Sequence, residues 1–237
     1  MEKSLAVIIP VFNEAENIRT TLETISQKVK TPHTVYIVYD FDDDNTLPVA
    51  RAIAARSGNI TFLKNPCRGV AGAIKTGLRQ AQQEYLLVSM ADMSDDYDKV
   101  DRMAQLMQDG YDLVCGSRYM RGGKQIGGGA LKIFLSRFAG VSLWYLANLP
   151  THDATNSFKM YSKTLIDRLT LESTAGFEVG IEILVKARSL GYRITEIPCV
   201  WKDRTTGTSR FKILKWAPHY LRWYFYGIKA NLMNCFK

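Results

Sequence analysis

The sequence predicts an α/β fold in which a mainly parallel central sheet is covered by helices on both faces. Apolar runs alternate with helical patterns over the first two-fifths of the chain, which is the order of right-handed β–α–β units. The first run, residues 5–9, is apolar at every position, as expected for a strand buried on both faces. The length of 237 residues and the 46% hydrophobic content suit one globular domain with at most an appendage.

The first half of the chain predicts five strands and three helices between them. The expected strands are residues 5–9, 35–39, 60–63, 85–88 and 112–115. Asn13 is predicted to cap the first helix, whose apolar positions recur at helical spacing from residue 18 to residue 29. Thr46 and Pro48 mark the start of the second helix, and an apolar stripe over residues 70–81 marks the third.

The second half is less regular. Its glycine-rich segment, residues 122–129, is predicted to be a flexible loop and a candidate lid, and it lacks the spacing of a nucleotide-binding glycine motif. A helical stretch over residues 131–149 follows, with apolar side chains near one face. We then expect a strand at 158–161, a helix at 178–190 and a strand at 194–201 that is broken by Pro198.

Polar clusters follow four of the predicted strands, at residues 10–14, 40–45, 91–96 and 116–118. In parallel α/β sheets, ligands bind at the carboxyl ends of the strands. Residues 40–44 contain four acids, which repel one another unless a cation or hydroxyl groups occupy the site. The sequence therefore predicts a polar ligand at this edge of the sheet.

The basic charge is concentrated near the C-terminal end. Of a net charge of +8, residues 204–237 supply seven Lys and Arg side chains and no acid. Residues 211–237 interleave aromatic and basic side chains, which predicts amphipathic interfacial helices on an anionic lipid surface. Packing on the domain and a subunit contact remain alternatives. No nucleic-acid-binding module accompanies the segment, so a nucleic-acid partner is not expected.

The predicted organisation is a domain at residues 1–210 and a basic, aromatic, membrane-interface segment at residues 211–237. The sequence contains no run of about 18 uncharged apolar residues, so no membrane-spanning helix is expected. The first apolar run is short and turns polar, so no secretory signal peptide is expected.

Seven ordered blocks of sequence resemble the family 2 glycosyltransferases of GT-A fold. Within that family, the chain is similar to the dolichol-phosphate mannose synthase-like, or polyprenyl-phosphate sugar synthase, group over about residues 4–225. The blocks are IIPVFNEAENI, IVYDFDDDNT, MADMSDD, GSRYMRGG, LSRFAG, HDATNSFKMY and WKDRTTGTSRFKILKW. The resemblance implies an inverting transfer of a hexose from a GDP- or UDP-sugar to a polyprenyl (dolichyl or undecaprenyl) phosphate. It also implies a peripheral enzyme at the cytoplasmic face of the membrane, with an integral membrane protein as a candidate further partner.

The resemblance assigns donor-binding roles by position. Pro10, Phe12 and Glu14 correspond to the first nucleotide-contacting loop. Asp40 corresponds to the acid that holds the base or the ribose. Asp42 is the next candidate, although it stands where the family often has serine.

Asp92 matches the second Asp of the family's D-x-D-type metal motif, which implies a divalent cation, Mg²⁺ or Mn²⁺. The chain departs from the family here, because Met90 stands where the first Asp is usual and Ser94 where Gln is common. A thioether is a poor ligand for these cations, which prefer hard oxygen atoms. Asp92 is therefore expected to hold the ion with donor phosphates and water, and Ser94, Asp95 and Asp96 are candidates to share it.

Three arginines and one acid complete the expected catalytic set. Arg118, Arg137 and Arg204 match basic positions that face the donor diphosphate or the acceptor phosphate in the family. The charge of a departing diphosphate needs such groups, and the planar guanidinium suits it. Asp153 matches an acidic position near the acceptor, where it would orient the acceptor or act as a base. A phosphate acceptor needs little help from a base, whereas a hydroxyl acceptor does.

Two alternatives remain open at this stage. A glycan hydroxyl would be the acceptor in a family 2 enzyme of another kind. A catalytically silent nucleotide-sugar-binding or membrane-scaffold protein is the other alternative, and Met90 motivates it. A dinucleotide-binding oxidoreductase is disfavoured, because no glycine fingerprint follows the first strand.

Overall fold

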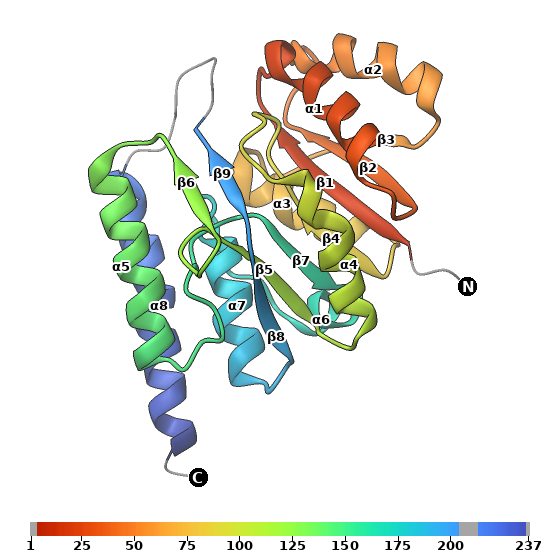
Figure 1. Cartoon of the computed structure of the whole chain (residues 1–237). Coiled ribbons are helices and arrows are strands. Elements are labelled where there is room, and N and C mark those ends of the chain that lie inside the picture. The colour runs from red at the N-terminus through yellow and green to blue at the C-terminus, as the bar shows by residue number, and fades with distance from the viewer. Residues whose placement is uncertain (1–3, 204–212, 236–237) are drawn as a thin grey trace.

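The computed structural model describes residues 4–203 and 213–235 of the chain. Seven strands form one sheet in the order β3-β2-β1-β4-β7-β5-β8 (Figure 1). They are β1 (Leu5–Val11), β2 (His33–Tyr39), β3 (Ile60–Lys64), β4 (Tyr85–Val88), β5 (Leu113–Ser117), β7 (Lys159–Ser162) and β8 (Ile194–Pro198). Two short strands, β6 (Lys124–Ile126) and β9 (Val200–Lys202), pair in parallel as a second sheet.

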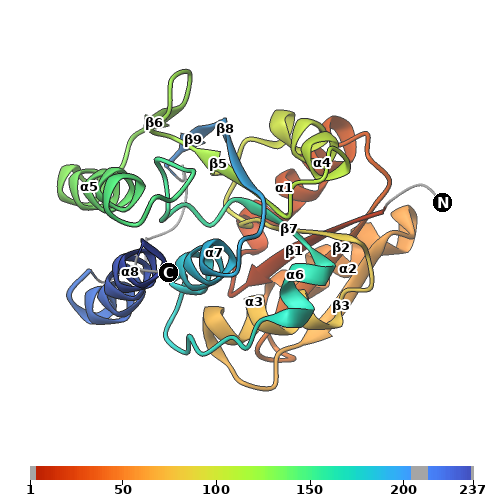
Figure 2. The ribbon, with the colours of Figure 1, turned by 90° about the horizontal axis from the view of Figure 1, so that it is seen from below.

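Helices cover both faces of the large sheet, as the sequence predicts. One face carries α1 (Ala15–Lys28), α2 (Thr46–Ser57), the 3₁₀ turn η1 (Tyr97–Lys99) and α4 (Val100–Gln108). The other face carries α3 (Gly69–Gln80), α6 (Lys163–Arg168) and α7 (Val179–Ser189). Two longer helices lie on that side: α8 (Ile213–Cys235) packs beside α7, and α5 (Ala130–Leu146) packs beside α8 (Figure 2).

The alternation of side chains along β1 explains why the sheet is covered twice. Leu5, Val7 and Ile9 point into the core beneath α1, α2 and α4. Ala6 and Ile8 point into the core beneath α3 and α7. All five side chains are fully buried, so the continuous apolar run of the sequence serves both cores.

One strand runs against the others. β7 is antiparallel to both of its neighbours, with Met160 opposite Leu87 of β4 and Val114 of β5. The remaining pairs in this sheet are parallel. The predicted strand at residues 158–161 is therefore confirmed, and it inserts between β4 and β5 rather than extending an edge.

Three local predictions need correction. Asn13 does not cap α1, because Glu14 flanks that helix and the backbone N–H of Asn13 donates to Asp44. Residues 122–129 are not all loop, since 124–126 form β6. The prediction of more than one C-terminal helix is wrong for residues 213–235, which form one helix that contains Pro218. The predicted domain boundary at 210/211 lies outside the described residues.

Helix α8 packs tightly on the rest of the fold. Trp223 is buried in the same core as α7, and its indole Nε1 donates to Ser173 Oγ at 2.9 Å. A Cβ on Gly227 would lie 2.9 Å from Val185 Cγ1, so glycine permits the close approach of α8 to α7. The C-terminal helix thus completes a core and also, as described below, exposes an apolar face.

Packing between α3 and β1 generates a stability prediction. A Cβ on Gly77 would overlap Ile8 Cγ2, because Gly77 is buried in α3 and Ile8 lies in the core beneath that helix. We expect Gly77→Ala to lower the free energy of unfolding by about 1–3 kcal/mol, because overpacking outweighs the gain of about 1 kcal/mol in helix propensity. The measurement is urea unfolding followed by circular dichroism. Gly129→Ala is the control, since a Cβ there meets nothing within 4 Å, and an equal loss in both variants would contradict the packing argument.

Candidate active site

The loops at the carboxyl ends of the strands have unusual backbone geometry. In residues 4–203 and 213–235, four non-glycine residues have positive φ, and three of them lie in these loops. They are Asn13 after β1, Arg68 after β3 and Met93 after β4, with φ of 54°, 48° and 61°. Such conformations are uncommon and persist where surrounding contacts hold them, as often happens at functional sites.

Two aromatic rings and one guanidinium group lie in contact after the ends of β1 and β2. Pro10 lies at the end of β1, and Phe12, two residues on, is 40% exposed. The Phe12 ring meets Phe41 edge to face, with centroids 5.8 Å apart. The Arg68 guanidinium lies over the Phe41 ring, 4.9 Å from its centroid. This arrangement leaves an aromatic surface at the open edge of the sheet, which is suited to a planar ligand.

Asp40 links the loop after β2 to the segment between β3 and α3. Its two carboxylate oxygens accept hydrogen bonds from Asn65 Nδ2 and from the Gly69 backbone N–H, each at 2.7 Å. Each oxygen retains a further lone pair for a ligand. Glu14 is held as well, because its side chain accepts from Asn17 Nδ2 at 2.9 Å.

The other acids of the second loop turn elsewhere. Asp42 forms an exposed ion pair with Lys64 at the end of β3. Its hydrogen bond raises the pKa of the Lys64 ammonium. Asp44 is buried and accepts from the backbone N–H groups of Asn13 and Thr46, which joins the loop after β1 to the loop after β2. The structure therefore separates the predicted pair, with Asp40 inside the loop cluster and Asp42 on its rim.

Two carboxylates in the loop after β4 are partly exposed, those of Asp92 and Asp96, and Asp95 is buried. The Asp92 Oδ1 accepts from the Ser94 backbone N–H at 3.2 Å. Asp95 points inward and accepts from Ser89 Oγ and the Met90 backbone N–H, at 2.9 and 2.8 Å. Burial, with the nearby charge of Asp92, raises the pKa of Asp95 to about 7.

Asp96 and Ser94 also accept hydrogen bonds from the protein backbone. Asp96 accepts from the Val200 backbone N–H at 2.9 Å, and Ser94 is buried with its carbonyl oxygen accepting from the Lys202 N–H. The Met90 side chain packs on the core. In the part of the chain that the structure describes, no three His, Cys, Asp or Glu side chains gather as metal ligands. The donor set fits a hard cation held by Asp92 together with oxygen atoms of a ligand, and it does not fit a closed protein cage.

A buried ion pair forms the second half of the site. Arg118, directly after β5, donates from Nε and Nη2 to Asp153 at 2.6 and 2.8 Å, and its backbone N–H donates to the same carboxylate at 3.0 Å. Asp153 is fully buried, and it also accepts from Asn156 N and Thr155 Oγ1. Burial opposes the charge of Asp153, but the Arg118 pairing outweighs burial and holds the pKa of this carboxyl below its ordinary value.

Hydroxyl groups link this pair to α5. Arg118 Nη2 also donates to Ser136 Oγ and Thr155 Oγ1, at 2.9 and 3.1 Å. The Tyr119 hydroxyl donates to Ser136 Oγ at 2.9 Å. The residue after Ser136, Arg137, is exposed and makes no hydrogen bond or ion pair with any residue that the structure describes. Arg137 thus stands beside the network with its guanidinium available.

The structure places the predicted residues in two groups. Pro10 lies near the end of β1, and Phe12, Glu14, Asp40 and Asp92 lie on the loops after β1, β2 and β4. Arg118, Asp153 and Arg137 lie around the loop after β5 and on α5. Arg204 lies outside the described residues. Sequence reasoning missed Asn65 and Arg68, because the polar residues after the third strand were not counted as a cluster. It missed Ser136 and Thr155 because a hydroxyl that orients an arginine has no signature in the sequence.

The chain matches one family model and is similar in sequence to known proteins. The family model described as "Glycosyl transferase family 2" matches residues 6–170. The chain is 25% identical to "Polyprenol monophosphomannose synthase" of Mycolicibacterium smegmatis over 230 residues, covering 89% of this chain and 86% of the relative. It is 24% identical to "Dolichol-phosphate mannosyltransferase" of Pyrococcus furiosus, covering 88% of this chain and 59% of the longer relative.

Solved structures share the fold at low sequence identity. Glucosyl-3-phosphoglycerate synthase from Mycobacterium tuberculosis, in complex with Mn²⁺, UDP and glucosyl-3-phosphoglycerate, aligns with a TM-score of 0.68 and 18% identity. That alignment covers 97% of this chain and 80% of the other. The same enzyme with Mn²⁺, UDP-glucose and phosphoglyceric acid aligns with a TM-score of 0.70, 17% identity and coverage of 96% and 80%. These likenesses establish the GT-A architecture.

The buried ion pair generates a prediction about pH and stability. Because pairing lowers the folded-state pKa of Asp153, this group stabilises the fold above the ordinary value of 3.8, and the contribution is lost as pH falls through the lower folded-state pKa. We expect Asp153→Asn to lower the free energy of unfolding by about 3–5 kcal/mol at pH 7, because Arg118 is left buried and unpaired. Urea unfolding of both proteins should show this gap narrowing below about pH 4.

The control for this prediction is Asp167→Asn, because Asp167 forms an exposed i,i+4 pair with Lys163 on α6. Its effect should stay within about 0.5 kcal/mol. An Asp153→Asn loss that matches the control would contradict the central role of the ion pair.

Proposed function

The chain belongs to glycosyl transferase family 2, and we propose that it transfers a hexose from a GDP- or UDP-sugar to a polyprenyl phosphate with inversion at the anomeric carbon. The names of both curated relatives support this acceptor class. The proposed location is the cytoplasmic face of a membrane, to which the protein attaches peripherally.

One observation carries the proposal most strongly: the available guanidinium of Arg137 sits beside exposed apolar side chains on the same helix. Phe134 and Phe138 of α5 are 65% and 59% exposed. They lie on one side of the helix, four residues apart, with Arg137 next to them. A cation bordered by an apolar surface suits an acceptor that combines a phosphate with a long hydrocarbon chain.

The loops after β1, β2 and β4 are the proposed donor half. The Phe12–Phe41 surface would stack on the nucleobase, with Arg68 behind it. Asp40, with lone pairs remaining on both oxygens, would accept from the base or the ribose. Asp42 would contact the donor only at the edge of this site, because its exposed carboxylate pairs with Lys64.

Asp92 is the proposed protein ligand for Mg²⁺ or Mn²⁺, with the donor phosphates completing the coordination shell. Ser94 and Asp95 contribute less than their position in the sequence indicates, because both are buried and hydrogen-bonded within the protein. When bound, such a cation would neutralise charge on the diphosphate. Arg118, Arg137 and Arg204 are proposed to meet the remaining phosphate charge.

The proposed reaction forms a bond from an acceptor phosphate oxygen to the anomeric carbon and breaks the bond from that carbon to the donor diphosphate. The acceptor oxygen is already anionic near neutral pH, so no proton has to be removed. This agrees with the environment of Asp153, whose oxygens accept from Arg118, Thr155 and Asn156 and whose pKa is lowered. We therefore assign Asp153 a positioning role toward Arg118, and this favours phosphate over a glycan hydroxyl as the acceptor.

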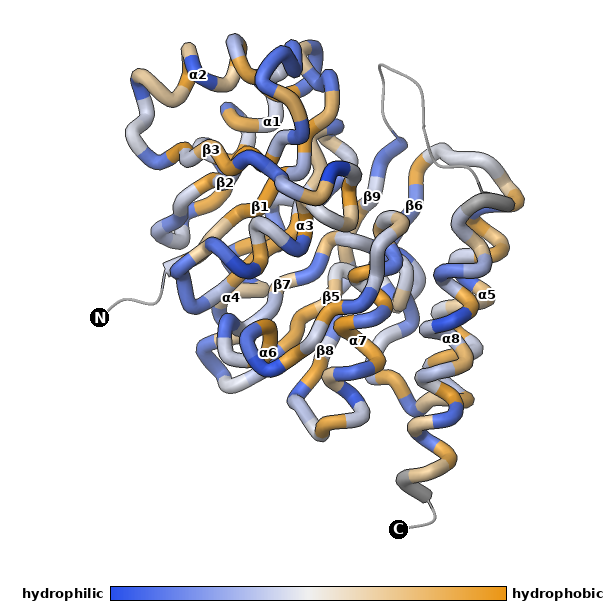
Figure 3. Tube along the Cα trace, turned by 180° about the vertical axis from the view of Figure 1, so that it is seen from behind, coloured by the Kyte–Doolittle hydropathy of each residue, from blue (hydrophilic) through white to orange (hydrophobic). Residues whose placement is uncertain are grey.

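Attachment to the membrane is proposed to involve α5 as well as α8. Both helices carry large apolar side chains that are at least 39% exposed, and Figure 3 shows hydrophobic residues recurring along each. This α5–α8 apolar surface consists of Leu131, Phe134, Leu135, Phe138, Tyr145, Leu146, Leu221, Phe225, Tyr226, Leu232 and Met233. Within the described residues, no helix is long and apolar enough to cross a membrane. Contiguous exposed apolar surface on a folded protein marks a contact with a partner or a lipid.

The first test is a donor panel scored by nucleotide release. Purified protein is mixed with GDP- and UDP-sugars, a polyprenyl phosphate in detergent, and Mg²⁺, Mn²⁺ or EDTA. We expect release that requires both lipid phosphate and a divalent cation, and Asp92→Asn to lower it by about 10²-fold or more. Asp98→Asn is the matched control, because its exposed carboxylate pairs with Lys28 outside the site. Donor binding without release would point instead to a glycan acceptor or to a binding protein.

The membrane contact has its own test. Replacing Phe134 and Phe138 together by serine should weaken binding to phosphatidylcholine–phosphatidylglycerol vesicles by about tenfold or more, since burial of each ring contributes about 1.5–3 kcal/mol when complete. Leu190→Ser is the control, because Leu190 is 61% exposed but lies on neither helix. Co-sedimentation gives the bound fraction, and urea unfolding shows that the fold is retained. Equal binding of the wild type and the double variant would exclude α5 from the contact.

A further inference from the structure

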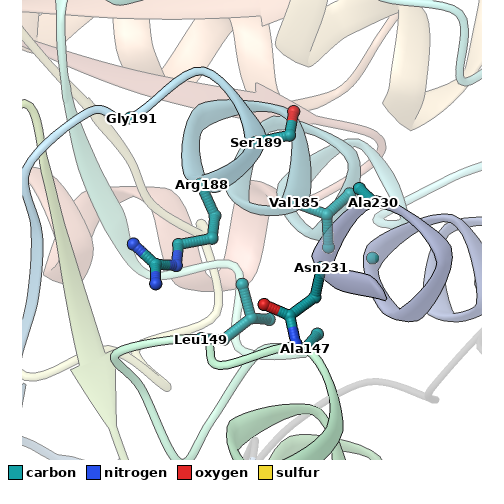
Figure 4. Close-up of a pocket in the computed structure, with 9 residues that line it drawn as sticks. Ala147, Leu149, Val185, Arg188, Ser189, Gly191, Ala230 and Asn231 are labelled. Atoms are coloured by element: carbon teal, nitrogen blue, oxygen red, sulfur yellow. The ribbon is translucent and has the colours of Figure 1, made fainter. Parts of the chain in front are cut away.

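A hollow lies at the opposite end of the parallel strands from the candidate active site. It has a volume of about 210 Å³ and opens where α5 and α7 end against the second half of α8 (Figure 4). Gly191 lines the hollow and lies just before β8, which begins at Ile194. The hollow therefore lies at the end of the sheet where the parallel strands begin. The proposed donor and acceptor groups lie where those strands end. No role in sugar transfer therefore accounts for this hollow.

The walls combine apolar side chains with three polar ones, those of Arg188, Ser189 and Asn231. The Ser189 hydroxyl donates to the Lys186 carbonyl oxygen at 2.9 Å. Ala147, Leu149, Val185 and Ala230 supply the apolar lining, and Arg188 and Asn231 project from α7 and α8 on two sides of the hollow (Figure 4). Asn231 is fixed, because its Nδ2 donates to the Leu146 carbonyl oxygen at 3.1 Å. Its remaining amide oxygen faces the space beside Arg188 (Figure 4).

Arg188 differs from the cations nearby. Lys186 of the same helix pairs with Glu172 and Glu182, and Arg222 of α8 pairs with Glu172. The guanidinium of Arg188 is partly buried and has no acidic or hydrogen-bonding partner among residues 4–203 and 213–235. A cation near the C-terminal end of a helix is favourable in itself. That effect explains its place in α7, but it does not explain a hollow built around it.

The size of the hollow and the residues that adjoin it limit the kinds of ligand that it can bind. Most sites for drug-sized ligands occupy about 300–1,000 Å³, so about 210 Å³ suits a phosphate with a short substituent rather than a nucleotide sugar. Two members of the α5–α8 apolar surface, Leu146 and Leu232, directly adjoin the lining residues Ala147 and Asn231 in the chain and are 50% and 53% exposed. A ligand with a phosphate in the hollow would thus have apolar surface at its exit.

We propose that this hollow binds the phosphate diester of one membrane phospholipid. The Arg188 guanidinium contacts the phosphate oxygens, and the acyl chains leave along the α5–α8 apolar surface. The proposal rests on the membrane attachment described under the proposed function and extends it from a general apolar contact to one headgroup site. It also fixes orientation, because a lipid held at the far ends of α5 and α8 would lay both helices along the bilayer.

The test compares vesicles with and without phosphate. Wild-type protein, Arg188→Gln and Ala230→Leu are sedimented with phosphatidylglycerol–phosphatidylcholine vesicles and with neutral digalactosyl diacylglycerol vesicles of the same chain length. Both variants should bind the phospholipid vesicles about five- to tenfold more weakly than the wild type, the first by removing the cation and the second by filling the hollow. Neither should change binding to the glycolipid vesicles. Arg56→Gln on α2 removes the same charge at an exposed site away from α5 and α8, and its binding should change less than twofold.

The outcomes separate this proposal from the membrane attachment itself. If the wild type binds neither kind of vesicle, the attachment fails and the hollow proposal fails with it. If the wild type binds both vesicles and Arg188→Gln binds like Arg56→Gln, the attachment stands and the headgroup site is overturned. Binding of soluble glycerol 1-phosphate, followed by phosphorus NMR line broadening that Arg188→Gln abolishes, would assign the hollow to a free phosphate ester instead. Urea midpoints equal to that of the wild type show that neither variant acts through unfolding.

Discussion

The ion pair between Arg118 and Asp153 is the constraint on which the second half of the molecule depends. Both groups are removed from water, which is expensive unless their hydrogen-bonding capacity is used. Asp153 meets this condition by accepting from the Arg118 side chain and backbone, Thr155 and Asn156. Through Ser136, the same network reaches α5. The end of β5, the loop before β7 and the helix that carries Arg137 are thus held by one charge pair, so the direction of α5 follows from it.

The donor half is organised by backbone groups rather than by charge pairs. Asp40 and Asp44 accept from main-chain N–H groups of neighbouring loops, and this allows an acidic cluster to exist without mutual repulsion dominating it. Asp42 accepts from no backbone N–H within residues 4–203 and 213–235, and it turns outward to Lys64. Three acids that look alike in sequence therefore have three roles. The difference arises from which backbone N–H groups each carboxylate reaches, those of the loop after β1 and of the first residues of α2 and α3.

The sequence was sufficient for the parallel core, because a buried parallel strand needs apolar residues on both faces, and residues 5–9 have no other explanation. It also placed the polar clusters at the correct edge, since that follows from the order of strands and helices. It did not predict that β7 would insert antiparallel between β4 and β5, because pairing between residues that are 44 to 77 positions apart leaves no periodic signal. Nor did it show that Asp95 turns inward, where its carboxylate accepts from the Met90 backbone N–H and the Ser89 hydroxyl.

The apolar stripe of residues 131–149 shows a further limit of pattern reading. Periodicity predicts that one face of a helix is shielded from water, but it does not identify the surface that shields it. In the fold, Gly140 and Leu143 are the residues of α5 that are buried, whereas Phe134 and Phe138 remain exposed. Among the residues that the structure describes, this exposed stripe lies beside Arg137, which has no acidic partner there. The polyprenyl phosphate that we propose as the acceptor would cover the rings with its hydrocarbon chain and would bring a negative charge to Arg137.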